Sequence, residues 1–267
     1  MKGAFSSPDE VLEREIMNHL FPDTTYGCES GGDPKNIPDL TYENFLNFHR
    51  TYYHPSNSYI YLYGNMDMEE KLAFLDEHYL SHFDYLDVDS VIQEQKAFGA
   101  CQDVTLEYPV AENEGEEDNT YLSYNMVVGN AADSQMAMAF EVLDYALLSA
   151  PGAPLKQALL DVKAGKDVYG SYDDGILQPY FTVIAKGSNP DRKEEFVSVI
   201  RQVLGDIVKN GIDKKAVEAG INYFEFRYRE ADFSSYPKGL MYSLDILGDW
   251  LYEKGNPFSA GTAAYSF

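Results

Sequence analysis

Apolar residues recur every three to four positions in several stretches of the chain, which is the spacing of one helix face. In residues 8–20 this spacing places Leu12, Ile16 and Leu20 on one side, and Ser7 stands where its side chain can cap the free amides. The same reasoning predicts helices over residues 41–53, 67–80, 133–148, 153–163, 189–210, 213–231 and 238–252. Strand-forming composition predicts strands over residues 58–63, 103–110 and 119–129, and two strands within 167–187 around a turn at Asp173-Asp174-Gly175.

The predicted strands come in pairs, and so do the predicted helices. This order is typical of an α+β fold, with a mostly antiparallel sheet and paired helices packed on it, and not of alternating βαβ units. Residues 22–40 are rich in Gly, Pro and Asp and predict a long ordered loop, whereas residues 84–100 lose the periodicity and predict a connector. We therefore interpret the chain as the second half of one α+β unit followed by most of another.

The net charge of the chain excludes two classes of binding partner, nucleic acids and anionic membranes. Its 267 residues carry 44 acidic and 20 basic side chains, a net charge of −24. A nucleic-acid-binding protein needs a basic surface, and an anionic membrane repels an acidic one, so we expect neither partner. The acidity suits a basic ligand instead.

Cysteine usage and the absence of targeting segments bear on location. Cys28 and Cys101 could form one bridge, but such sparse use fits a reducing compartment at least as well. The first residues contain no apolar stretch and no apolar run reaches membrane-spanning length, so we expect neither a signal peptide nor a transmembrane helix. We therefore expect a cytoplasmic protein.

Few residues form a recognisable catalytic pattern. His78 and His82 stand four positions apart on one predicted helix face, as a zinc-binding pair does. No Glu lies between them to serve as the general base, so we interpret them as surface or helix-capping histidines, with a metal site built from them and nearby acids as the lesser alternative. Cys28 lacks a base at a fixed spacing, and the acidic stretch Glu112–Asp118 lacks the residue order of a calcium loop, so we interpret both as loop residues.

Two stretches have a distinctive order of residues. One is Met1-Lys2-Gly3 with the helix start that follows, and the other runs Gly-Gly-Asp-Pro, Leu-Thr, a helix, Tyr-Tyr-His-Pro-Ser-Asn, a strand and Gly-Asn within residues 31–65. This order of residues resembles that of the pitrilysin/insulinase superfamily of zinc metallopeptidases. The residues themselves are most similar to those of the presequence-protease branch. The resemblance is dense over residues 1–85 and less distinctive over 100–260. Its signature residues, which we interpret as mainly structural, are Gly31, Gly32, Asp33, Pro34, Tyr53, Pro55, Asn57 and Gly64.

The resemblance implies a zinc site and also implies that this chain lacks it. In that family an inverted His-x-x-Glu-His motif supplies two zinc ligands and the general base, and a Glu about 75 residues later, directly before a Met-Lys-Gly stretch, supplies the third ligand. This sequence has no His-x-x-Glu-His and begins at Met1-Lys2-Gly3. We therefore expect no catalytic residue, no metal ligand and no bound zinc in this chain, although zinc is the cofactor of the parent family.

The resemblance also implies a domain plan and a role. Residues 1–85 would be the C-terminal half of the first peptidase-type domain, 86–100 a connector, 101–260 a second, non-catalytic and truncated domain, and 261–267 an atypical tail. The parent would be a metalloendopeptidase that degrades peptides in a closed chamber, and this chain, inactive alone, would supply chamber wall. Its partners would be the peptide substrate and the missing N-terminal half-domain, or a second copy joined through an open sheet edge. The alternative is a non-catalytic peptide-binding or partner subunit with the same fold.

Overall fold

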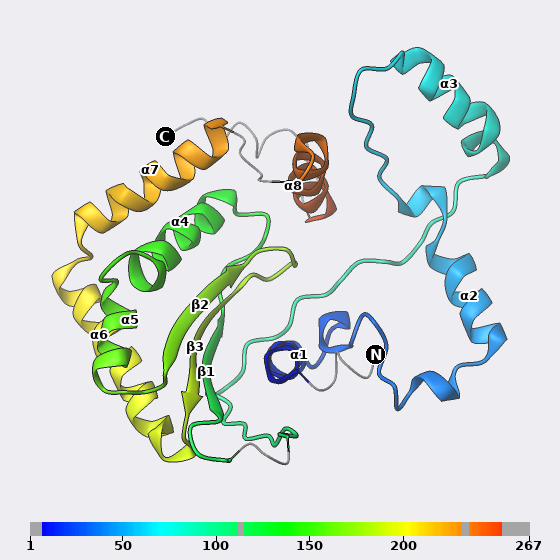
Figure 1. Ribbon diagram of the computed structural model, residues 1–267. Helices are drawn as coiled ribbons and strands as arrows, with labels where there is room; N and C mark the ends of the chain where they lie inside the picture. Colours follow the sequence, from blue (N-terminus) through cyan, green and yellow to red (C-terminus); the bar gives the residue numbers. More distant parts are fainter. Residues whose placement is uncertain (1–6, 112–114, 231–234, 253–267) are drawn as a thin grey trace.

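The computed structural model describes residues 7–111, 115–230 and 235–252, and it has the expected α+β architecture (Figure 1). The elements are α1 (Pro8–Leu20), α2 (Tyr42–Tyr52), α3 (Met68–His78), β1 (Thr120–Val127), α4 (Ser134–Asp144), α5 (Pro154–Asp161), β2 (Asp167–Asp173), β3 (Tyr180–Ser188), α6 (Lys193–Asn210), α7 (Lys214–Glu230) and α8 (Lys238–Tyr252). All the predicted helices are confirmed. The predicted tail over 261–267 and the Met1-Lys2-Gly3 start lie outside the described residues.

The three strands form one antiparallel sheet in the order β1-β3-β2. β2 and β3 are the predicted pair, with Val168 opposite Ala185, and β1 joins the other side of β3, with Tyr124 opposite Val183. Because side chains alternate along a strand, Val183 and Ala185 point into the apolar core, whereas Lys186 points to the opposite face.

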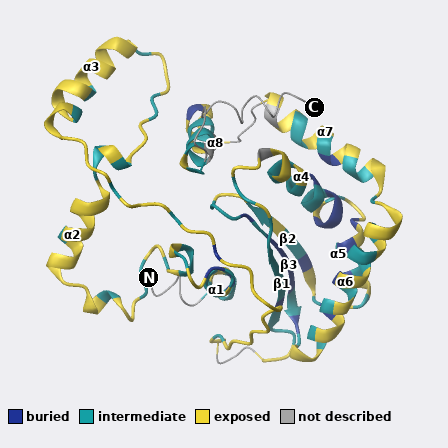
Figure 2. Ribbon diagram, turned by 180° about the vertical axis from the view of Figure 1, so that it is seen from behind, coloured by how far each residue is buried: buried dark blue, intermediate teal, exposed yellow. Residues whose placement is uncertain are grey.

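Helices cover the two faces of the sheet unequally. Figure 1 shows α4, α5, α6 and α7 on one side and α1 alone on the other. The core lies between the sheet and the larger helical layer, where Figure 2 shows the buried residues. Its most deeply buried side chains are Leu148, Leu155, Leu159, Val168, Val183, Phe196 and Ile200. The helices of this layer and the three strands follow one another along residues 120–230, so the core is built from one continuous stretch of the chain.

α4 ends four residues earlier than predicted and continues as a π-helical turn, Tyr145–Ser149. The turn lies close against β2, where a Cβ atom on Gly170 would come within 2.3 Å of Leu148 Cδ1 and 2.5 Å of the Thr182 carbonyl oxygen. Glycine is therefore needed at position 170 for the helix and the strand to approach this closely.

Asp144 lies at the junction of α4 and the π-helical turn. Its Oδ2 accepts a hydrogen bond from the Ser149 hydroxyl at 3.3 Å, while its Oδ1 is buried without a hydrogen-bond partner among the described residues. Burial raises the pKa of this carboxyl above its ordinary value. Asp144 is thus a source of instability inside the helical layer.

Residues 40–86, which we call the arm, stand apart from the sheet (Figure 1). Thr41 begins α2 with a capping box, in which Thr41 Oγ1 accepts from the Asn44 amide at 3.1 Å and Asn44 Oδ1 accepts from the Thr41 amide at 3.2 Å. Neither α2 nor α3 contains a buried residue, and Figure 2 shows most of the arm exposed. In the segment between α2 and α3, the ring of Tyr59 stacks on that of Trp250 of α8, with centroids 4.4 Å apart.

The predicted strands over residues 58–63 and 103–110 are wrong, because a strand exists only where its backbone pairs with another. Tyr59 in the first segment packs on α8 and not on a neighbouring strand. In the second, Asp103 forms an ion pair with Lys193, and the Tyr108 hydroxyl donates to the Asn119 carbonyl, so side chains hold the segment near the start of β1 without a ladder.

Neither Ser7, the predicted cap of α1, nor Asn189, which begins the predicted helix over 189–210, caps its helix with its side chain. The Ser7 side chain makes no capping hydrogen bond, and only its carbonyl accepts from the Val11 amide, at 3.0 Å. Asn189 precedes the short Pro190–Arg192 turn and α6, but its side chain bonds Asp118 instead of the free helix amides. At Asn189 the distant Asp118 therefore takes the side chain that would otherwise cap the helix.

Asp144→Asn should stabilise the protein at neutral pH. A carboxyl whose pKa is raised on folding resists ionisation in the native state, so it weakens stability increasingly as the pH rises through its native pKa. The variant removes that ionisation and should gain up to about 1 kcal/mol in unfolding free energy, since partial exposure screens the carboxylate.

Urea unfolding of both proteins, followed by circular dichroism across a pH series, measures this difference. The gain should shrink as the pH falls toward the ordinary aspartate range. Asp206→Asn, at an exposed position of α6, is the matched control and should change little. A gain that is the same at every pH would contradict the assignment.

Candidate functional site

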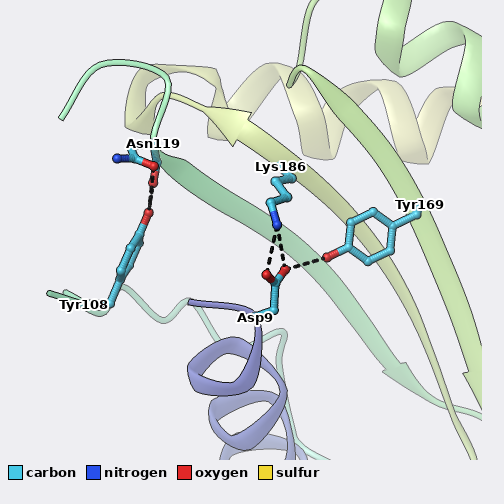
Figure 3. A network of polar contacts seen from close by, with 5 residues as sticks. All are labelled: Asp9, Tyr108, Asn119, Tyr169 and Lys186. Atoms are coloured by element: carbon cyan, nitrogen blue, oxygen red, sulfur yellow. Dashed lines mark hydrogen bonds and ion pairs between the residues drawn. The ribbon is translucent and has the colours of Figure 1, made fainter. Parts of the chain in front are cut away.

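A polar cluster joins α1 to the face of the sheet that points away from the core (Figure 3). Asp9, in the first turn of α1, accepts hydrogen bonds from Lys186 Nζ of β3 at 2.9 and 3.1 Å. The Tyr169 hydroxyl of β2 donates to the same carboxylate at 3.4 Å, and Lys186 Nζ lies 5.1 Å from the centroid of the Tyr121 ring of β1. All three strands therefore contribute a side chain to one contact with α1, and we call these four residues the α1 clamp.

The electrostatics of the α1 clamp favour the charged form of Lys186. Its pKa is raised, chiefly by the neighbouring Tyr121 side chain and then by the Asp9 carboxylate beside it. The pKa of Tyr169 is also raised, first by burial and then by the Asp9 charge. The stabilisation by Lys186 is therefore complete below the ordinary lysine pKa and is lost only as strong alkali titrates the native amine.

A second polar contact closes the loop that leads into β1. Asn189 Nδ2 donates to Asp118 Oδ1 at 2.7 Å, and Asn189 Oδ1 accepts from the Asp118 amide at 2.8 Å. Asp118 adopts a positive φ of 56°, and Lys166 Nζ lies 3.3 Å from its carboxylate. Asn189 and then Lys166 lower the pKa of Asp118. The described part of the predicted acidic turn is thus fastened at Asp118 by an amide and an ammonium group.

These contacts can fasten segments together, but they do not form a catalytic constellation. The Asp9 carboxylate and the Lys186 ammonium bind each other, so neither presents a free base or nucleophile. Across the described ranges, no group of three or more His, Cys, Asp or Glu residues could hold a metal ion. The same part of the chain contains no helix long and apolar enough to cross a membrane.

The structure places the candidate residues of the sequence in turns and helix ends. His78 is the last residue of α3, with its ring 4.4 Å from that of Phe74, and His82 belongs to the short Leu80–His82 turn. Cys28 and Cys101 are both free and exposed. These residues are not brought together into one site.

The signature residues also occupy turns. Gly32 has a φ of +83° beside Ile37, and the Asp33 carbonyl accepts from the Asn36 and Ile37 amides. Tyr53 directly follows the last residue of α2 as its C-cap, and Pro55 begins the next turn. The Asn57 side chain donates a hydrogen bond to the Tyr52 carbonyl at 3.0 Å and accepts one from the Ser90 hydroxyl at 2.6 Å. Gly64 has a positive φ of 138°. Gly31 and Pro34 lie in the same exposed loop as Gly32. Their structural interpretation stays a prediction.

Sequence reasoning missed the α1 clamp. Asp9 has a sufficient local explanation as an acid at the positive end of a helix dipole, and an isolated Lys186 in a strand carries no signal. Their contact spans 177 positions, so no local pattern could reveal it.

Comparison with known proteins gives one family. Residues 39–224 match the family model described as the peptidase M16 inactive domain. Protein HypA of Clostridium perfringens is 48% identical over 258 residues, covering 97% of this chain and 26% of that protein. Presequence protease 1, chloroplastic/mitochondrial, of Arabidopsis thaliana is 36% identical over 262 residues, covering 97% of this chain and 24% of that protein. The chain thus spans about a quarter of the length of these relatives.

A solved structure supports the same fold. The M16-like peptidase from Alicyclobacillus acidocaldarius superposes with a TM-score of 0.60 at 17% identity, over 98% of this chain and 64% of that one. At this identity the likeness concerns the architecture alone.

Lys186→Met should loosen α1 while leaving the core intact. Methionine keeps the apolar stem but removes the charge that holds Asp9, and such a partly exposed pair contributes at most about 1 kcal/mol to global stability. The local effect should be larger, because trypsin cleaves after Arg14 only when α1 leaves the sheet.

Limited trypsin digestion followed by mass spectrometry measures that cleavage. Lys71→Met, which breaks the exposed pair of Lys71 and Glu70 on α3, is the matched control and should leave cleavage after Arg14 unchanged. Equal cleavage rates for wild type and Lys186→Met would show that the clamp does not hold α1.

Proposed function

Because this chain belongs to the M16 peptidase family, through the domain described as inactive, we propose that it is the non-catalytic portion of a larger zinc endopeptidase of the presequence-protease kind. It contributes wall to a closed chamber in which the catalytic portion cleaves peptides. The observation that carries the proposal is the match to the inactive domain in a chain without His-x-x-Glu-His.

The family is typically zinc-dependent, but the residues present here do not fit the metal. The family motif is absent from the sequence, and the described residues offer no cluster of ligands. We therefore assign no step of hydrolysis to this chain. Its role in this proposal is to bind the peptide, to enclose it in the chamber and to position it for cleavage by the catalytic portion.

The charge distribution supports basic peptides as the enclosed substrate. Residues 1–150 hold 28 of the 44 acidic residues but only six of the 20 basic ones. An acidic wall attracts peptides rich in Lys and Arg and raises their local concentration. Two exposed free cysteines are consistent with a reducing, cytoplasmic location, which we propose on the same terms.

A second candidate is a separate partner subunit that binds peptides or a catalytic chain without any hydrolysis. The observation that favours it is the exposed arm, which has the character of a docking surface. The two candidates differ in whether adding this chain changes peptide cleavage by a catalytic portion.

Co-expression with a catalytic portion tests the proposal. The purified chain alone should contain no stoichiometric zinc by mass spectrometry and should cleave no fluorogenic peptide. With the segment of the Clostridium perfringens relative that lies N-terminal to its matching region, it should raise cleavage of a Lys/Arg-rich peptide at least about tenfold, because the wall helps to bind the substrate. The segment alone is the control.

The outcomes separate the two candidates. Tight zinc with chelator-sensitive cleavage by this chain alone would overturn the non-catalytic assignment. Binding to the segment without any gain in cleavage would favour the separate subunit. A matched Asp/Glu-rich peptide should be cleaved less efficiently than the basic one, and an equal kcat/KM would remove the role of the acidic wall.

A further inference from the structure

Helix α8 lies between the arm and the compact part of the molecule, by which we mean α1, the sheet and helices α4 to α7. Figures 1 and 2 show it there from opposite sides. Among the described residues, the hydrogen bonds, ion pairs and ring contacts that leave the arm reach only its flanking residues Ile37 and Ser90, and α8. Neither α2 nor α3 contains a buried residue. The position of the arm therefore depends on α8.

α8 meets the arm through aromatic rings near both of its ends. The ring of Trp250 stacks on that of Tyr59 with centroids 4.4 Å apart and an interplanar angle of 28°. The rings of Tyr242 and Tyr63 lie 6.4 Å apart. A Cβ atom on Gly239, in the first turn of α8, would come within 2.0 Å of the Tyr63 ring, so glycine allows the helix to lie directly on the arm. The first and last turns of α8 thus touch the same short segment of the arm.

The last residue of α8 is joined to the compact part by hydrogen bonds. The hydroxyls of Tyr252 and Tyr26 lie 2.8 Å apart, and this contact spans 226 positions of the sequence. Tyr26 belongs to the short Thr25–Gly27 turn after α1, and its hydroxyl also accepts from the Leu177 amide at 3.1 Å. Burial and then the Tyr26 hydroxyl raise the pKa of Tyr252. One hydroxyl therefore connects α8, the loop after α1 and the segment between β2 and β3.

The two attachments lie on opposite sides of the helix. Trp250 and Tyr252 are two positions apart, which places them about 200° apart around a helix axis. Trp250 can therefore reach the arm while Tyr252 reaches the compact part. The last turn of α8 is a bridge between two parts that otherwise stand apart.

We propose that α8 is a strap that fixes the arm to the compact part, and that opening either of its two attachments lets the arm swing while the core stays folded. The arm is otherwise joined to the compact part through residues 28–39 and 87–94, and neither segment contains an α-helix or a strand. The inference concerns contacts within this chain and does not rest on the proposed function. Under that function both parts are chamber wall, so the strap would set the angle between two pieces of the wall.

Trp250 is the only tryptophan of the chain, so its fluorescence reports on the contact with the arm. Tyr59→Ala removes the stacked ring and should shift the Trp250 emission to longer wavelength, because water then reaches the indole. Tyr252→Phe keeps the ring and removes only the hydroxyl that meets Tyr26, so it should leave the emission unchanged. The two variants open the strap on opposite sides.

The position of the arm is measured in the full 267-residue chain by pulsed electron paramagnetic resonance between two nitroxide labels. Cys28→Ser and Cys101→Ser remove the native thiols, which are both exposed. Gln135→Cys on α4 and Glu77→Cys on α3 place the labels at exposed positions of the compact part and the arm. With the strap intact, the labels should give one narrow distance distribution.

Tyr59→Ala and Tyr252→Phe should each widen this distribution at least about twofold, because a part held only by flexible chain undergoes collective motion. Tyr85→Ala is the matched control and should leave the distribution narrow, since Tyr85 is 83% exposed in the arm and takes part in no ring contact among the described residues. Circular dichroism should show the same helix content in all three variants. Tyr252→Phe changes a single hydroxyl, so it keeps the test decisive even where Tyr59→Ala lowers stability.

Three results would overturn the strap. The first is a distribution as wide with the strap intact as in Tyr59→Ala, and the second is equal widening by Tyr85→Ala. The third is a distribution in Tyr252→Phe as narrow as with the strap intact, because Tyr26 would then not hold α8. None of these results bears on peptide cleavage in the presence of a catalytic portion, so the proposed function is tested separately.

Discussion

The contact between Asp9 and Lys186 fixes the position of α1 on the second face of the sheet, and both faces of the sheet must be covered in this fold. Helices α4 to α7, close in sequence to the strands, cover one face. Only a distant segment remains for the other, and α1 supplies it, burying Ile16 and Phe21. The carboxylate of Asp9 places the first turn of α1 over β3, while the Phe21 ring meets Tyr180 edge-on at 6.2 Å near the other end.

The contact between α1 and the sheet joins the two predicted units, because α1 belongs to the first unit and the sheet to the second. Gln95 of the predicted connector is buried, where its side chain exchanges hydrogen bonds with Asp23 and its amide donates to Gln178 at 2.6 Å. A segment interpreted as a connector is therefore fixed at one point to the loop after α1 and to the strand hairpin. The predicted boundary between residues 85 and 101 stays a prediction, but α1 lies on the sheet that follows that boundary.

The compact part and the arm illustrate two ways in which the same kind of residue is used. In α5 and α6, an apolar stripe meets the sheet, so Leu155, Leu159 and Ile200 are fully buried. In α2 and α3 large apolar side chains, among them Phe45, Phe48 and Leu72, remain exposed instead. Under the proposed function this contrast has a meaning, because the rest of a larger peptidase would cover the exposed side chains. An incomplete surface is then the expected property of a part.

Local sequence determined every α-helix of the described structure, because capping residues and apolar spacing act within one or two turns, as at Thr41 and Asp67. It also determined the β2–β3 pair and the absence of the zinc motif, which the order of residues alone decides. Only the tertiary structure decided which extended segments are strands, since the pairing that residues 58–63 and 103–110 lack depends on distant neighbours. The same holds for the α1 clamp: Asp9 and Lys186 meet because chain folding brings together positions that no local pattern connects.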